Sequence, residues 1–183
     1  MPITIGDAPK SDFTNPLGML SDCHRRIERF LSILAQITEG AHDRELNEDQ
    51  RAALVAALRY FREAAPRHTL DEEESLFPRM RAHGEACALL DSLHTDHQIA
   101  EDLHKGVDAL GRCWLEAGQL SSGEAHRLAE MLEELSDIYK HHIALEDSRV
   151  SPLAGRLLTP AEVAAIGGEM AARRGIRPLS QWG

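Results

Sequence analysis

The sequence has no long apolar run and no recognisable leader. No stretch of its 183 residues approaches the roughly 18 consecutive apolar residues that a membrane-spanning helix needs. The first residues lack a basic start followed by an apolar run and a small-residue cleavage site, so they do not resemble a secretory signal. We therefore expect a cytoplasmic protein without a membrane partner.

Cysteine and positive charge are also scarce. The three cysteines, Cys23, Cys87 and Cys113, are an odd number without C-x-x-C spacing, which argues against a disulfide framework and against a thiolate zinc site. We interpret them as reduced, mostly buried thiols. Lys and Arg number 20 against 30 Asp and Glu, and the formal net charge of −10 would repel a phosphate backbone. Nucleic acid is not an expected partner, and nothing indicates an oligomeric state.

Helical patterns fill most of the chain, and alternating β-branched runs are missing. Apolar residues recur every three or four positions in four segments, 15–40, 47–84, 85–117 and 121–151, with Pro66 expected to kink the second. These lengths and the short connections predict an all-α protein, an antiparallel up-down-up-down four-helix bundle with a short extra C-terminal helix from Thr159. We divide the chain into an N-terminal arm (1–14), the bundle (15–155) and a C-terminal helix and tail (156–183). The tail ends near Trp182, and the sequence does not say whether it covers the bundle or docks a partner.

Four of the ten histidines stand on the apolar stripes, one in each segment. Each is followed four residues later by a glutamate, a spacing that places both side chains one turn apart on one helix face. The pairs are His24 with Glu28, His68 with Glu72, His97 with Glu101, and His142 with Glu146. Burying such groups without a partner would cost roughly several kcal/mol for each carboxylate. A pair of bound metal ions is the simplest compensation.

An internal repeat distinguishes two of these pairs from the others. The histidine, the glutamate and a following proline recur at a displacement of 74 residues, as His68, Glu72 and Pro78 and again as His142, Glu146 and Pro152. His24 and His97 correspond at a displacement of 73. Glu72 and Glu146 are therefore the predicted carboxylate ligands. For Glu28 and Glu101, ligation and surface salt bridges both remain open.

The predicted metal ligands are two glutamates and four histidines: His24, His68, Glu72, His97, His142 and Glu146. Imidazole and carboxylate ligands without thiolate suit iron or manganese, and a carboxylate able to bridge suits two such ions. His94 remains open as a fifth nitrogen ligand, and Asp147 as a substitute for Glu146. We interpret His104 as a core or channel residue, expect His141 to point away from the site, and assign to the surface His42, His83 and His126.

This combination resembles the hemerythrin-like family, the HHE cation-binding domain, over roughly residues 15–153. The residues that carry the resemblance are His24, His68-x-x-x-Glu72 with Pro78, His97, and His142-x-x-x-Glu146 with Pro152. The resemblance implies a helix bundle around a non-haem di-iron centre, two Fe ions with an oxo or hydroxo bridge, although Mn or a mixed Fe/Mn pair also suits these ligands.

The sequence departs from the oxygen-carrying members of that family. Those members take two histidines one turn apart from the third helix and a His-x-x-x-x-Asp pair from the fourth. Here Leu93 stands one turn before His97, and the fourth helix aligns as His-x-x-x-Glu. The chain therefore resembles a four-histidine, two-glutamate variant, which leaves about two coordination positions open where five histidines would leave about one. A reversible oxygen carrier is thus less favoured than a site that binds or reacts with oxygen, peroxide or nitric oxide, or responds to iron.

Our leading hypothesis is a cytoplasmic di-iron protein that binds or senses a small oxidant, and we assign no catalytic residue. The first alternative is a di-iron enzyme of oxidant detoxification or iron–sulfur cluster repair. It is weakened because the repair relatives carry a separate cysteine-bearing N-terminal domain, whereas only about fourteen residues precede the first helix here. A ferritin-like oxidase ranks lower, since only Glu101-x-x-His104 fits its Glu-x-x-His pattern. A metal-free helical interaction module is the last alternative, and metal content separates it from the others.

Overall fold

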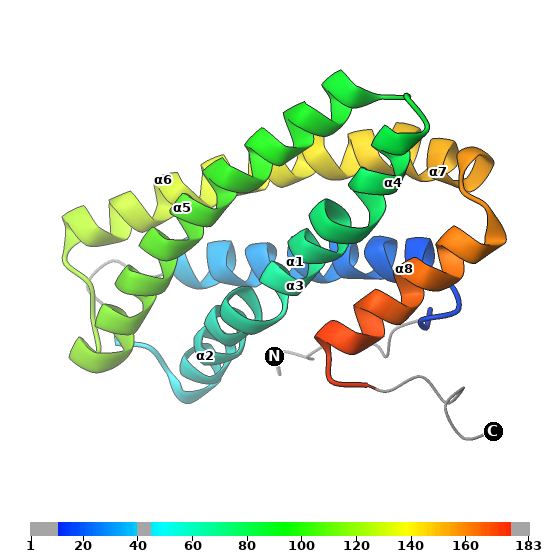
Figure 1. The fold of residues 1–183 in the computed structure, drawn as a ribbon. Helices are drawn as coiled ribbons and strands as arrows, with labels where there is room; N and C mark the ends of the chain where they lie inside the picture. The colour runs from blue at the N-terminus through cyan, green and yellow to red at the C-terminus, as the bar shows by residue number, and fades with distance from the viewer. Residues whose placement is uncertain (1–10, 40–44, 177–183) are drawn as a thin grey trace.

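The computed structural model describes residues 11–39 and 45–176 (Figure 1). Within these residues every regular element is a helix and no strand occurs, which confirms the all-α prediction. None of the helices in this part of the chain is both long and apolar enough to cross a membrane. Trp182 and His42 lie outside the described residues.

The bundle has four arms. The first arm is α1 (Pro16–Glu39), and the second consists of α2 (Glu48–Glu63), α3 (Ala65–Asp71), η1 (Glu72–Leu76) and α4 (Phe77–Ala82). The third arm is α5 (Cys87–Ala117), and the fourth consists of α6 (Ser122–Leu145), η2 (Glu146–Val150) and α7 (Ser151–Leu157). Contacts of α1 with α2, α2 with α5, α5 with α6, and α6 with α1 close these arms into a ring. The arrangement is the expected bundle.

Side-chain caps define where several helices begin. Asn47, Ser121 and Thr159 each accept a hydrogen bond from a backbone N–H three residues later, and the side chain of that later residue bonds back to the cap. The reciprocal bonds satisfy N–H groups that a helix start leaves free. In the second arm the helix breaks at Ala64, which ends α2 and precedes α3, two residues before Pro66. The kink expected from Pro66 is therefore present.

Two π-helical turns interrupt the second and fourth arms at equivalent positions. In η1 the Phe77 N–H donates to the Glu72 carbonyl, and in η2 the Ser151 N–H donates to the Glu146 carbonyl, each five residues back. Pro78 and Pro152 follow directly, and the ring of a proline clashes with the carbonyl four residues earlier in a regular α-helix. A wider turn relieves that clash. Both π turns begin at a predicted glutamate ligand.

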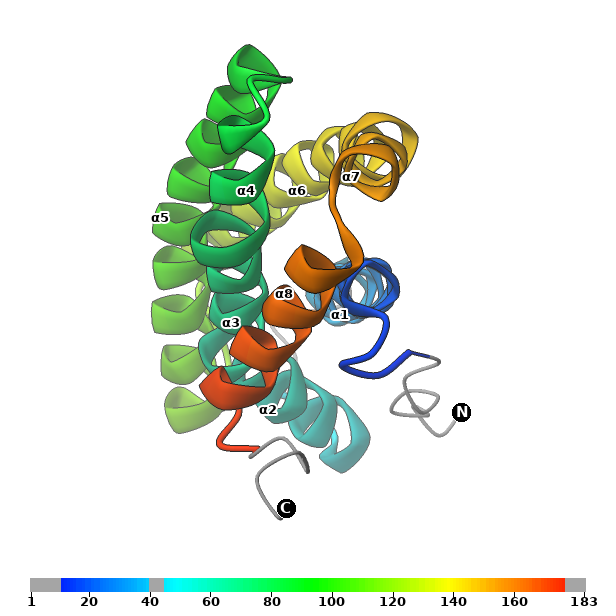
Figure 2. The ribbon, with the colours of Figure 1, turned by 45° about the vertical axis from the view of Figure 1, so that its right-hand side comes forward.

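The apolar core is divided into two clusters. One contains the C-terminal half of α1 with α2, the later part of α5 and α6, and includes Leu34, Leu58, Trp114 and Leu135. The other contains the start of α1 with η1, α4, the start of α5 and α7. The additional helix α8 (Pro160–Arg173) contributes Ile166 and Met170 to this second cluster and contacts α1, α3 and η1 (Figure 2). The C-terminal helix thus covers one side of the bundle.

The cysteines correct one expectation. All three are free thiols, but only Cys23 is buried, whereas Cys87 and Cys113 are exposed. The prediction of mostly buried thiols was therefore wrong for two of the three. Cys87 begins α5, and Cys113 lies on its outer face near the end of that helix.

Candidate metal centre

The six predicted ligands lie together in the layer between the two apolar clusters. His24 comes from α1, His68 and Glu72 from the second arm, His97 from α5, and His142 and Glu146 from the fourth arm. All six are buried, and His97 is the most accessible at 8%. The four arms therefore contribute to one polar layer inside an otherwise apolar bundle.

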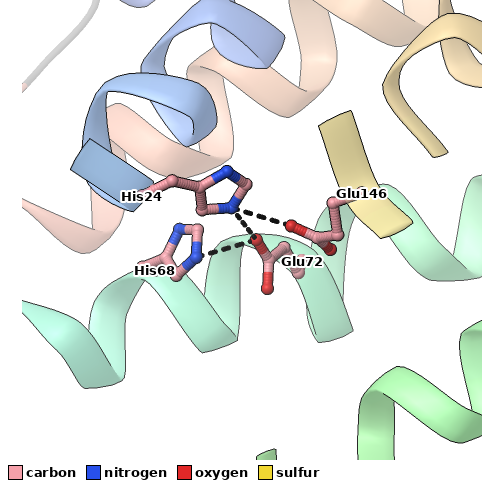
Figure 3. A group of neighbouring side chains, drawn as sticks. All are labelled: His24, His68, Glu72 and Glu146. Atoms are coloured by element: carbon pink, nitrogen blue, oxygen red, sulfur yellow. Dashed lines mark ion pairs between the residues drawn. The ribbon is translucent and has the colours of Figure 1, made fainter. Parts of the chain in front are cut away.

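The potential ligand atoms form two groups that share one carboxylate. Each residue of a group offers an atom that lies within 4.8 Å of those of the other members. The first group is His24, His68, Glu72 and Glu146 (Figure 3), and the second is Glu72, His97 and His142. Two neighbouring metal positions, one in each group, would share Glu72.

Both glutamates extend an oxygen toward each group. Glu72 Oε1 is 3.0 Å from His68 Nε2, and its Oε2 is 3.1 Å from His97 Nε2. Glu146 Oε2 is 2.8 Å from His24 Nε2, and its Oε1 is 3.8 Å from His142 Nε2. A carboxylate whose two oxygens face different sets of histidines is arranged to bridge two cations.

Several of these atoms are buried without a hydrogen bond. They are His24 Nε2, Glu72 Oε1 and Oε2, His97 Nε2, His142 Nε2 and Glu146 Oε1. Buried polar atoms normally have a partner, because leaving one unsatisfied costs about 1–3 kcal/mol. The short nitrogen–oxygen distances in the layer join atoms that are not aligned for hydrogen bonding with one another. Nitrogen and carboxylate oxygen donors left in this way fit a pair of metal ions.

The two carboxylates differ in their electrostatic surroundings. Burial alone would raise the pKa of the Glu72 carboxyl, but the imidazoles of His68, His24 and His97 hold it well below its usual range. Burial and the nearby Glu72 raise the pKa of Glu146, against the lowering effect of His24. Glu72 is therefore the charged centre of the layer, and Glu146 carries a proton more readily.

The histidines of the layer differ in the direction in which their pKa values shift. Burial would lower the pKa of His24 and of His97, but the adjacent carboxylates raise both to about 9. Burial lowers the pKa of His142 to about 3. Metal binding needs neutral imidazole and ionised carboxylate, so metal uptake at neutral pH should release protons from His24 and His97.

Acidic residues lie beside the second nitrogen of three of the four histidines. The pairs are His24 Nδ1 with Asp147 Oδ1 at 3.3 Å, His97 Nδ1 with Glu73 Oε1 at 2.7 Å, and His142 Nδ1 with Asp96 Oδ2 at 3.4 Å. Such carboxylates orient a metal-binding imidazole and make it more basic. His68 instead interacts with the Cys23 thiol. Burial raises the pKa of that thiol, but the interaction with His68 lowers it, and the pKa of Cys23 lies below its usual value.

The side chains that the sequence left open occupy distinct places. Glu28 and Glu101 are exposed, and Glu101 pairs with Lys105 at 2.9 Å, so neither joins the polar layer. His94 is half-exposed, with Nδ1 2.7 Å from Glu73 Oε1, and so shares Glu73 with His97. Asp147 contacts His24 from outside the layer.

The other histidines are scattered over the structure. His83, His126 and His141 are exposed. His104 packs on Phe61 with ring centroids 4.4 Å apart, and its Nε2 is 3.0 Å from the Tyr139 hydroxyl, with which it forms a hydrogen bond. The sequence did not identify Asp96 as a neighbour of His142. The two residues lie on different helices, and no local pattern predicts which acidic residue of one helix approaches a histidine of another.

A cavity of about 540 Å³ opens beside the second group. His97 lies in its wall together with the outer carboxylate Glu73. Its remaining wall is mainly apolar and includes Phe61, and the His104–Tyr139 pair also lines it. The first group, by contrast, contributes none of its histidines to this wall. The cavity therefore gives small molecules an approach to the His97 side of the layer.

These features define an all-helical protein with a buried, carboxylate-linked histidine centre suited to metal ions. The chain matches the hemerythrin family, described as the hemerythrin HHE cation binding domain, over residues 15–154, and it belongs to that family. It is also 30% identical over 173 residues to an uncharacterised protein of Haemophilus influenzae, a match that covers 90% of this chain and 93% of the relative. The family match includes all six residues of the polar layer and ends before α8.

Proposed function

We propose that the protein is a cytoplasmic non-haem di-iron protein that binds or senses a small oxidant, such as oxygen, peroxide or nitric oxide. The proposed ligands are His24, His68, Glu72, His97, His142 and Glu146, with an oxo or hydroxo bridge completing the link between the two iron ions. The observation that carries this proposal is the set of buried donor atoms without hydrogen bonds, contributed by all four arms. When bound, the iron pair would supply open coordination positions and reversible electron transfer.

The two donor groups differ in their access from the surface, which favours one side for ligand binding. With both glutamates bridging, each metal position has two histidines and the same two carboxylates. The difference concerns the second group, which contains His97 and His142. The cavity reaches this second group at His97. We infer that small molecules enter along the cavity and bind on the His97 and His142 side.

Residues of this chain would control the surroundings of that ligand. Burial lowers the pKa of His104 to about 4, so its imidazole stays neutral near pH 7. Its hydrogen bond to Tyr139 satisfies the phenol without adding charge to the cavity wall. The apolar part of the wall, which includes Phe61 and Val107, offers a small, weakly polar molecule a favourable surface near His97.

Metal analysis and absorption spectroscopy test the proposal together. Protein produced with adequate iron should hold about two irons per chain, with a near-ultraviolet charge-transfer band that changes on reduction and on exposure to oxygen, peroxide or nitric oxide. His68→Ala and His142→Ala should each remove at least one metal while helix content stays largely intact, because the apolar stripes still drive bundle formation.

The fourth arm offers a matched control. His126 and Glu130 on α6 have the same four-residue spacing as His142 and Glu146, and His126 Nε2 lies 3.1 Å from Glu130 Oε1. The side chains of both His126 and Glu130 are exposed. His126→Ala should leave the metal content unchanged. Full metal content in the His68 and His142 variants would refute the ligand assignment, and wild-type protein without metal would favour the helical interaction module.

A further inference from the structure

A buried ion-pair cluster lies directly behind the polar layer. Asp71, one residue before Glu72, is fully buried at the end of α3. Two arginines at the end of α8 and just beyond it reach its carboxylate: Arg173 Nη1 donates to Oδ1 at 2.9 Å, and Arg174 Nη2 donates to Oδ2 at 2.6 Å. A buried carboxylate needs such compensation, and two guanidinium groups supply it.

Both arginines are themselves fixed by further contacts. Arg173 also donates to Ser75 Oγ at 2.7 Å, a residue inside the π turn η1. Arg174 donates to the Met170 carbonyl at 2.8 Å. The cluster therefore connects α8 to both the residue before Glu72 and the turn that Glu72 begins.

Close packing holds α8 in position for these contacts. A Cβ atom at Gly167 would lie 2.0 Å from the Phe13 carbonyl oxygen, so the helix backbone approaches the residues before α1 as only glycine allows. Arg174 lies over the Phe13 ring, 6.0 Å from its centroid. The helix is thus held on one side by residues before α1 and on the other by Asp71.

We propose that α8 positions the bridging glutamate Glu72, through the Arg173 and Arg174 contacts to Asp71 and Ser75, and so sets how tightly the centre holds metal. This inference rests on the proposed metal centre. Glu72 belongs to both donor groups, so a small rotation of η1 would move its two oxygens relative to both metal positions. The arginines also offset a second carboxylate beside the layer, which would otherwise repel Glu72 or take up metal itself.

The fourth arm shows that this arrangement is not part of the repeat. Leu145 stands 74 residues after Asp71, and Arg149 stands at the position that corresponds to Ser75. Arg149 is exposed. The cluster is therefore particular to the Glu72 side, and its arginines come from beyond the segment that matches the family.

Cobalt(II) titration of the full-length, metal-free protein tests the proposal, because the visible absorption of bound cobalt reports its coordination geometry. Asp71→Asn and the double variant Arg173→Ala/Arg174→Ala should weaken cobalt binding about 10-fold and shift the visible spectrum. Arg174→Lys keeps the charge but loses the paired N–H donors that reach both oxygens of Asp71, so its cobalt affinity should lie between those of wild type and the double variant.

The control removes another ion pair of the same helix. His83, just after α4, has Nε2 3.2 Å from Glu162 Oε1 at the start of α8, at the opposite end of that helix from Arg173. His83→Ala should change cobalt affinity by less than about 3-fold and leave the spectrum unchanged. Circular dichroism of each metal-free variant establishes that the bundle is folded, and Asp71→Asn compared with wild type provides the test if the double alanine variant does not fold.

The outcomes separate this inference from the proposed function. Unchanged affinity and spectrum in folded Asp71 and arginine variants would overturn the positioning role alone. An equal effect of His83→Ala would also overturn it, since general loosening of α8 would then explain the result. Wild-type protein that binds no cobalt would overturn the proposed centre as well.

Discussion

The second and fourth arms share a sequence repeat and a backbone device but not an environment. Each has a histidine, then a glutamate that begins a π turn, then a proline. Glu72 nevertheless has histidine nitrogens of both donor groups close to 3 Å away, whereas the close histidine neighbour of Glu146 is His24, at 2.8 Å. As a result the pKa of Glu72 is held far below its usual range by His68, His24 and His97, and burial raises that of Glu146.

The flanking residues extend this contrast. Asp71 and Glu73, on either side of Glu72, contact arginines of the α8 end and His97 respectively. The corresponding positions of the fourth arm are Leu145, which carries no charge, and Asp147, which lies beside His24 Nδ1 as Glu73 lies beside His97 Nδ1. The repeat therefore determines where the backbone turns, while the residues that pack on each turn determine its charge.

The largest expected effect compares the two glutamates directly. Glu72→Gln should remove metal from both positions, because this carboxylate belongs to both donor groups. Glu146→Gln should retain more metal, since Glu146 lies 2.8 Å from His24 but 3.8 Å from His142. Metal content per chain after desalting measures both variants. The reverse order would show that Glu146 is the central ligand.

The outer carboxylates should differ in the same direction. Glu73 Oε1 is 2.7 Å from His97 Nδ1, whereas Asp147 is 42% exposed and lies 3.3 Å from His24 Nδ1. Glu73→Gln should weaken metal binding by about 10- to 100-fold, and Asp147→Asn by less. Competition with a chelator of known affinity measures both. Equal losses would mean that exposure does not weaken the Asp147 contact.

A third difference between the arms should appear in the pH dependence of stability. The fourth arm carries Tyr139, the hydrogen-bond partner of His104, where the second arm has Ala65. The Tyr139 partner His104 has its pKa lowered by burial from 6.5 to about 4, so the unfolded chain binds more protons between these values. The metal-free protein should therefore lose about 2 kcal/mol of its unfolding free energy from this residue between pH 7 and pH 5. Urea denaturation at both pH values should show a smaller loss in His104→Gln. If His104→Gln and wild type lost the same unfolding free energy between pH 7 and pH 5, the His104 imidazole would not be held neutral by burial.

The smallest effect is expected at His94, the second histidine that contacts Glu73. His94 is half-exposed, and an exposed ion pair contributes about 1 kcal/mol or less. His94→Ala should therefore change metal affinity by less than about 5-fold. Chelator competition against wild type measures this, with Glu73→Gln as the reference for a strong effect. A loss as large as that of Glu73→Gln would identify His94 as a ligand.

Much of the fold was visible in the sequence. The apolar stripes predicted the helices, and the helix starts expected near positions 121 and 159 are capped by the side chains of Ser121 and Thr159. The stripes also placed the six candidate ligands on inward faces, and the structure brings all six into one layer. Whether they bind metal stays a prediction. The family resemblance is confirmed by the match over residues 15–154.

Other features depend on contacts that no local pattern encodes. Glu28 and Glu101 have the same spacing from histidine as Glu72 and Glu146 but are exposed. Residues four apart still differ by about 40° around a helix, so the spacing alone does not decide which of them faces inward. The arginine contacts to Asp71 join residues more than 100 positions apart, and α8 had to be placed before they could be recognised. Pro78 and Pro152 marked the π turns only after the backbone was known.

The 74-residue repeat also has a meaning for symmetry. The chain is two helical hairpins, α1 with the second arm and α5 with the fourth, and each hairpin supplies two histidines and one glutamate. A pseudo-twofold axis through the polar layer would exchange them. The unlike neighbours of Glu72 and Glu146 break this internal symmetry, so the two halves of the centre are alike in their ligands and different in their charge.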